Sequence, residues 1–93
     1  MGKKIQLKTN FSLRSRSSGE MELPPSLNTI AELLRHIGKE IGFVFIDAQG
    51  LTLRRDVEVL INGKDISFLP TGLKTILKEG DSVDVALMTL GGG

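Results

Sequence analysis

The most informative absence in this sequence is cysteine, which does not occur once in 93 residues. Without a thiol the chain has no disulfide, no thiolate nucleophile and no cysteine ligand for zinc or an iron–sulfur cluster. A chain without cysteine is compatible with a reducing compartment, and we expect a cytoplasmic protein.

Aromatic and imidazole side chains are also scarce. Four Phe and no Trp or Tyr leave few of the flat platforms on which nucleic-acid bases stack. The one histidine, His36, has no partner at a motif spacing that would make a triad or a zinc site, and we expect it to face solvent. No glycine-rich loop follows a strand and opens a helix, as a phosphate cradle requires. The sequence therefore does not indicate an enzyme, a metal site or nucleic-acid binding.

Neither charge nor hydropathy marks the chain for a polyanion or a membrane. The formal net charge is +1, so there is no overall field to attract nucleic acid. No stretch approaches the ~20 apolar residues of a membrane helix, and the start MGKKIQLK lacks the apolar region of a signal peptide. The basic residues before Glu20 are expected to form a solvated strand face and turn, with a docking patch for an acidic partner as the alternative.

Alternating apolar residues predict a hairpin at the start of the chain. Over residues 4–13 every second residue is apolar or Thr, which is typical of a half-buried strand. After the turn segment RSRSSG the alternation resumes in EMEL, with Met21 and Leu23 inward, until Pro24 ends it. We expect the two strands to pair antiparallel, with outward Lys residues of the first facing outward Glu residues of the second.

One amphipathic helix follows the hairpin. Thr29 and Glu32 have the spacing of a capping box. The apolar residues after this box recur at the spacing of one helix face: Ile30, Leu33, Leu34 and Ile37. Gly38 or Gly42 is expected to end the helix.

The rest of the chain predicts further strands. The apolar run FVFI (43–46) is a candidate strand, followed by the turn DAQG. In DVEVLINGKDI (56–66) apolar residues alternate up to an Asn-Gly pair, a strong signal for a hairpin turn. A loop or single helical turn, FLPTGL, and a Gly-Asp turn then precede the last strand, VDVALM (83–88).

These elements predict a two-layer α+β fold in the order strand, strand, helix, strand, strand, strand. A mixed sheet of four to five strands would pack on one main helix and bury its apolar face. We place this domain at residues 1–88 and expect residues 89–93 to form a flexible glycine tail.

The three glycines that end the sequence suggest a chemical use. A terminal carboxylate is ionised at neutral pH and can attack the α-phosphate of ATP in another protein's pocket. Consecutive glycines carry no side chains, so such a backbone fits a narrow channel. The alternative is a tail without a function.

Several segments, taken in order, resemble one family. FSLR, TIAELLRHIG, DVEVLINGKDI, GLKTILKEGDSVDV and the terminal glycines are similar to the MoaD/ThiS-type sulfur carriers, which are ubiquitin-like proteins. The small subunit of molybdopterin synthase is the closest comparison, and LKEGDSV with TLGGG also resembles the ubiquitin-related modifier of tRNA thiolation. The resemblance covers nearly the whole chain and implies a β-grasp fold.

The resemblance also implies a carrier role. In this family an adenylating enzyme of the MoeB/ThiF type activates the terminal glycine with ATP, and sulfur is installed as a thiocarboxylate. A sulfur-accepting synthase subunit is the second partner implied. The chain itself would bind no cofactor and would be a substrate, or the small subunit of a sulfur-transfer synthase.

The reactive end implied by the resemblance is the glycine run. Counted without a gap, the family's Gly-Gly falls on Gly91 and Gly92, with Gly93 as an extra residue. Either Gly93 is the reactive end, which we expect, or it is removed before activation.

A docking surface is expected beside the tail. Leu60 lies in the outward phase of its strand, so the core does not account for it. Ala86 and Met88 are outward on the last strand. By similarity to ubiquitin-like proteins, we expect Leu60, Ala86, Met88 and Leu90 to bind the partner. Scattered exposed apolar residues are the alternative.

Two other functions remain open: a modifier joined to lysines of other proteins, and a β-grasp interaction module whose glycines are only a tail. The pathway that would receive the sulfur also remains open among molybdopterin or tungstopterin, thiamine, cysteine or methionine, and tRNA thiolation.

Overall fold

The computed structural model describes residues 3–11, 19–49 and 52–88. Leu13 and the predicted tail, which includes Leu90, Gly91, Gly92 and Gly93, lie outside the described residues. The described elements follow one another as β1 (Lys3–Thr9), β2 (Gly19–Leu23), α1 (Ile30–Ile41), β3 (Val57–Ile61), β4 (Lys64–Asp65), the 3-10 helices η1 (Ile66–Phe68) and η2 (Gly72–Lys74), and β5 (Ser82–Leu87).

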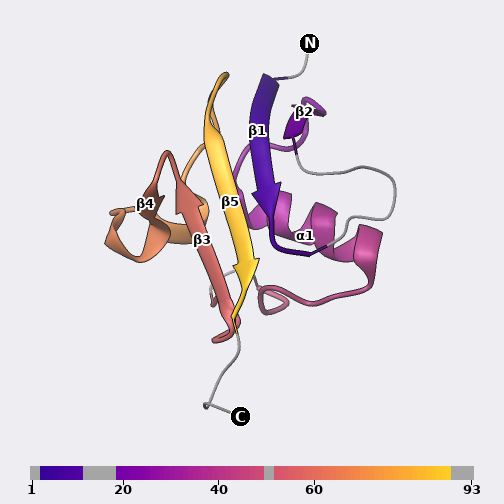
Figure 1. The fold of residues 1–93 in the computed structure, drawn as a ribbon, viewed down its shortest axis with the longest axis vertical. Helices are drawn as coiled ribbons and strands as arrows, with labels where there is room; N and C mark the ends of the chain where they lie inside the picture. The colour runs from indigo at the N-terminus through magenta and orange to yellow at the C-terminus, as the bar shows by residue number, and fades with distance from the viewer. Residues whose placement is uncertain (1–2, 12–18, 50–51, 89–93) are drawn as a thin grey trace.

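The sheet of the described residues has five strands in the order β2-β1-β5-β3-β4, with α1 across one face (Figure 1). β1 and β5 pair in parallel at the centre, and the other neighbours are antiparallel. A parallel pair cannot be joined by a tight turn, so the chain must cross over between its strands. The structure confirms the predicted β-grasp arrangement, in which a mixed sheet packs on one main helix.

The first hairpin has the predicted register. Lys4 lies opposite Glu22, so a basic and an acidic residue occupy paired positions on the outer face of the sheet. Ile5 lies opposite Met21, and both side chains are buried against the helix. The alternation in the sequence therefore predicted the correct face for the paired residues of this hairpin that the structure describes.

The helix begins at the predicted cap. The Thr29 hydroxyl accepts a hydrogen bond from the Glu32 amide at 3.2 Å, and a Glu32 carboxylate oxygen accepts one from the Thr29 amide at 2.9 Å. These bonds satisfy amide groups that have no partner within the helix. Of the two glycines proposed as its end, Gly42 is the C-cap, with a left-handed backbone at φ 71°.

The core forms where the apolar helix face meets the inner face of the sheet. Leu33 and Leu34 have no exposed surface, and Val59 and Val83 of the central strands are equally buried. The Asn-Gly turn between β3 and β4 is also confirmed, since Asn62 has φ 52° and Gly63 has φ 82°, the signs that a type I′ hairpin turn requires.

The prediction of a strand at FVFI was wrong. Residues 43–46 form an irregular segment after α1, with a single isolated bridge between Ile46 and Leu53. Phe45 and Ile46 are buried in the core, which accounts for the apolar run without any strand pairing. A short apolar run indicates burial, and it does not specify the partner of the backbone.

Candidate functional site

The end of β5 is fixed from both sides. The Asn10 side-chain amide donates to the Leu87 carbonyl and its oxygen accepts from the Leu87 amide, both at 2.8 Å. The Met88 amide donates to the Asp56 carbonyl at 2.7 Å, which extends the pairing with the segment before β3 by one residue. The chain therefore leaves the sheet at residue 88 from a firmly bonded position.

Of the predicted docking residues, Leu60 and Ala86 lie in the outward phase of β3 and β5, and Met88 directly follows β5. Leu60 and Ala86 are half-buried, and Met88 is 41% exposed. The register places Leu60 opposite Asp84 and places Ala86 opposite Glu58. Ala86 is thus a diagonal neighbour of Leu60 and lies two residues from Met88 on the same strand.

Leu60 and Met88 are not direct neighbours. Asp84 is the β5 residue opposite Leu60, and it lies four residues before Met88. At about 3.4 Å per residue this is a separation of about 13–14 Å along the sheet. Ala86 joins the two residues, so they form a diagonal stripe instead of one compact patch. Leu90, the fourth predicted residue, lies outside the described residues.

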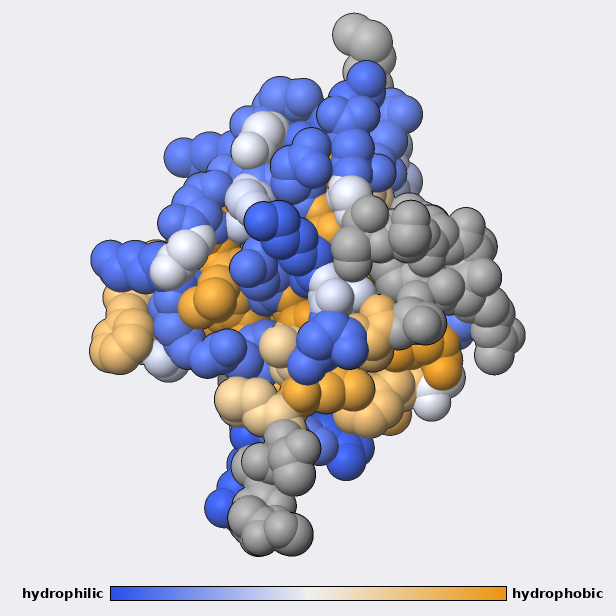
Figure 2. Space-filling model, in the orientation of Figure 1, coloured by the Kyte–Doolittle hydropathy of each residue, from blue (hydrophilic) through white to orange (hydrophobic). Residues whose placement is uncertain are grey.

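Charged side chains share the outer face with this stripe. Glu58 and Asp84 flank Leu60 and Ala86, and Lys8 of β1 lies opposite Asp84. Figure 2 views the molecule in the orientation of Figure 1, and its upper half is mostly hydrophilic while apolar surface gathers in the lower half, where β5 ends. The outer face therefore changes from polar to apolar toward the start of the tail.

The remaining titratable groups do not form a catalytic cluster within the described part of the chain. His36 is half-buried on α1, and no three His, Asp or Glu side chains there gather as a metal site. The pKa of Glu32 is lowered from its ordinary value of 4.5, first by the hydrogen bond from the Asn28 amide and then by those from Thr29. This shift belongs to the helix cap and not to a reactive site.

Three exposed apolar side chains were missed by the sequence reasoning. Val44, Phe68 and Ile76 are 69%, 76% and 53% exposed. Val44 lies inside the run that was predicted to be a strand, and because that prediction was wrong its exposure was not foreseen. No described helix is long and apolar enough to cross a membrane.

A family model described as the ThiS family matches residues 9–93. The chain belongs to the ThiS family. This match covers the described domain from the end of β1 onward and also the glycine run. A search of curated proteins gave no match.

Solved structures share the fold over nearly the whole chain. The Haloferax volcanii HVO 2177 protein is 25% identical with a TM-score of 0.72, covering 98% of this chain and 88% of its own. Small archaeal modifier protein 1 from Methanosarcina acetivorans is 22% identical with a TM-score of 0.67, covering 99% of both chains. Urm1 from Trypanosoma brucei is 21% identical with a TM-score of 0.63, covering 98% of this chain and 97% of its own. The last two likenesses establish the fold alone.

Proposed function

We propose that this ThiS-family chain is a sulfur carrier whose terminal glycine carboxylate is the reactive group. The carboxylate attacks the α-phosphate of ATP bound to an adenylating partner, which forms an acyl-adenylate and releases pyrophosphate. A sulfide equivalent held by the partner then displaces AMP and leaves a thiocarboxylate. The chain binds no cofactor itself, works in the cytoplasm and passes its sulfur to an accepting synthase subunit.

The observation that carries this proposal is the extent of the family match, which runs through Gly91, Gly92 and Gly93. The absence of cysteine supports it, because the chain has no thiol that could hold sulfur instead. The bonds that Asn10 and Asp56 make to Leu87 and Met88 support it too. They give a tail a fixed point of departure, so docking of the domain limits the region that the carboxylate can reach.

Removal of Gly92 and Gly93 tests the proposal. We expect ATP–pyrophosphate exchange with the cognate adenylating enzyme to be abolished, since the carboxylate falls short by two residues, about 7 Å. Reacting atoms must approach to about 3–3.5 Å, so the domain cannot compensate while it remains docked. Gly92→Val keeps the length and adds a branched side chain, and it should also block exchange. Persistence of exchange in both variants would reject the carrier function.

Charge placed on the diagonal stripe tests where the adenylating enzyme binds. We expect Leu60→Asp and Met88→Asp together to weaken binding at least tenfold, because an apolar contact is replaced by a buried charge without a partner. Ile76→Asp is the matched control, since Ile76 is an exposed apolar residue that does not belong to the outer-face stripe. Binding measured by calorimetry should separate the two. Equal affinity for all variants would remove the stripe from the docking surface.

A modifier is the second candidate, favoured by the similarity of the fold to small archaeal modifier protein 1 from Methanosarcina acetivorans. In this case a lysine amine of a target attacks the acyl-adenylate, forms an isopeptide bond and releases AMP. The intact mass of the protein from its native cells distinguishes the outcomes. Replacement of one oxygen by sulfur supports the carrier, whereas recovery of the chain bound to other proteins through lysine supports the modifier. The same spectrum shows whether Gly93 is present or has been removed.

A further inference from the structure

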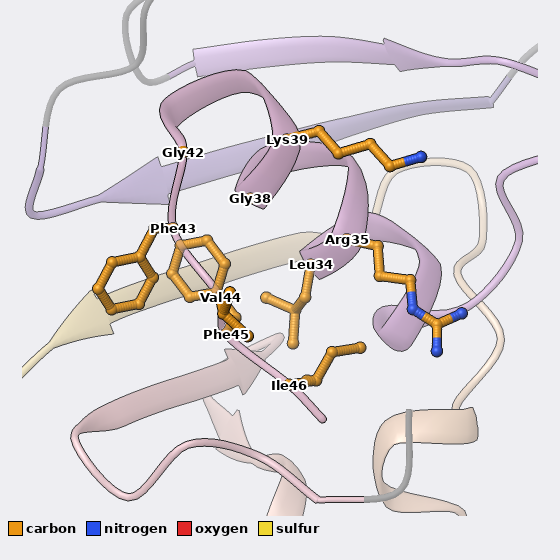
Figure 3. Close-up of a pocket in the computed structure, with 9 residues that line it drawn as sticks. All are labelled: Leu34, Arg35, Gly38, Lys39, Gly42, Phe43, Val44, Phe45 and Ile46. Atoms are coloured by element: carbon orange, nitrogen blue, oxygen red, sulfur yellow. The ribbon is translucent and has the colours of Figure 1, made fainter. Parts of the chain in front are cut away.

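A groove lies between the second half of α1 and residues 43–46 (Figure 3). Its cavity has a volume of about 300 Å³, and its walls are mainly the apolar side chains of Leu34, Phe43, Phe45 and Ile46. We call it the α1 groove. None of the outer-face residues Leu60, Ala86 and Met88 lines it, so it is separate from the surface assigned to the adenylating enzyme.

Two glycines leave this groove open. Gly38 and Gly42 both line it and contribute no side chains to fill it. At the rim, Val44 is 69% exposed, a large apolar side chain beside an apolar hollow. A buried wall with an exposed apolar rim is typical of a surface that a partner covers.

The charges at the groove are all positive. Arg35 and Lys39 are one turn apart on α1, and their side chains extend from the same side of the helix (Figure 3). No acidic side chain lines the groove. The Arg35 guanidinium donates to the Ala48 carbonyl at 2.6 Å, which fixes its position. Within the described residues Lys39 has no hydrogen-bond or ion-pair partner, so its ammonium group is available to an anion.

The backbone at the rim also has free groups. The amide of Phe43 donates to the Gly38 carbonyl, and the carbonyl of Phe45 accepts from the Arg54 amide. Between them, the amide and carbonyl of Val44 have no backbone partner among the described residues. Unpaired backbone groups at an exposed residue can form hydrogen bonds with a further strand.

We infer that the α1 groove binds an extended segment of a partner protein in which apolar residues adjoin carboxylates. An apolar side chain of the segment fills the cavity, its backbone pairs with Val44, and its carboxylates meet Arg35 and Lys39. A volume of about 300 Å³ is at the lower limit for small-molecule pockets and suits one or two side chains. This inference goes beyond the carrier function, since the groove includes neither the tail nor the stripe.

The experiment titrates the isotope-labelled full chain with a fluorescent peptide of three branched aliphatic residues followed by four glutamates. We expect amide shifts concentrated at residues 34–48 and affinity in the micromolar range or weaker. Lys39→Glu should weaken binding about tenfold or more, because a charge-assisted hydrogen bond is replaced by repulsion. Val44→Glu should act in the same direction at the exposed rim. Lys74→Glu, a charge reversal at an exposed site outside the groove, is the matched control and should bind as the unchanged chain does.

A second peptide with lysines in place of the glutamates tests the role of charge, and it should not bind. Equal binding of both peptides, or binding that survives Lys39→Glu, would overturn the inference. Shifts at the groove that grow with protein concentration and without peptide would assign it to a second copy of the chain instead. Shifts caused by phosphatidylserine vesicles and not by the acidic peptide would assign it to a lipid surface, which also overturns the inference. Adenylation of the Lys39→Glu variant is measured separately, so that a failure of peptide binding can be distinguished from a failure of the carrier function.

Discussion

At the scale of single residues, the two glycines near the end of α1 have different functions that the sequence did not separate. Gly42 supplies the left-handed backbone of the cap. Gly38 lies four residues earlier within the helix and is buried. A Cβ atom built on Gly38 would lie 2.4 Å from the Phe43 carbonyl oxygen. Both glycines have the spacing of a helix end, and only the path of the chain after α1 shows that Gly38 is required for close packing.

Gly38→Ala should therefore destabilise the protein although alanine favours helices. The gain in helix propensity is about 1 kcal/mol, whereas overpacking against a backbone atom costs about 1–3 kcal/mol or more. We expect a net loss of at least about 1 kcal/mol in the free energy of unfolding, measured by urea denaturation. Lys39→Ala, at the exposed neighbouring position, should change it by less than about 0.5 kcal/mol. A Gly38→Ala variant as stable as the parent would show that the 38–43 contact is loose.

At the scale of elements, α1 is held at its start by charge as well as by hydrogen bonds. One Glu32 carboxylate oxygen accepts from the amides of Asn28 and Thr29 at 2.8 and 2.9 Å. These bonds favour the ionised carboxylate and lower its pKa in the folded state below the ordinary 4.5. The capping box was predictable from the Thr29 and Glu32 spacing alone, because both partners lie within one helical turn.

The lowered pKa of Glu32 predicts the direction of a pH effect. Its contribution to stability is complete above the ordinary pKa of 4.5 and is lost as the pH falls through the lower folded pKa. The thermal stability of the parent protein should therefore lose the contribution of Glu32 as the pH falls below about 5. Glu32→Gln cannot titrate and should lose less over the same range. Parallel pH profiles for the two proteins would contradict a stabilising ionised cap.

Elements that depend on distant partners were harder to predict. The run FVFI was predicted as a strand, but its backbone hydrogen bonds go to Gly38 in the helix and to Arg54, partners that its own composition does not specify. The outward phase of Leu60 and Met88 followed from alternation. Their separation did not, because it depends on the register between β3 and β5, which no local pattern encodes.

At the scale of the whole molecule, the helix, the mixed sheet and the four longer strands β1, β2, β3 and β5 were predictable, since each of these elements has its own periodicity. The family resemblance implied the β-grasp fold, which is confirmed, but no prediction placed β5 at the centre of the sheet, where the structure has it. The α1 groove was not predicted at all. It depends on how the helix, two glycines and an irregular segment meet, and its basic pair at Arg35 and Lys39 looks like any solvated helix face in the sequence.

The central place of β5 has a consequence for how the protein is made. β5 is the last described strand in the sequence, yet it joins the β1–β2 pair to the β3–β4 pair, with contacts such as Asn10 to Leu87 that span 77 positions. During synthesis the inner strand edges of both pairs remain unpaired until residues 82–87 leave the ribosome. The formation of such long-range contacts is slow. The hydrogen bonds that fix the end of β5 can therefore form only when the whole domain has folded. An adenylating partner that requires the fixed end of β5 would discriminate against nascent, truncated or misfolded chains without a separate proofreading step.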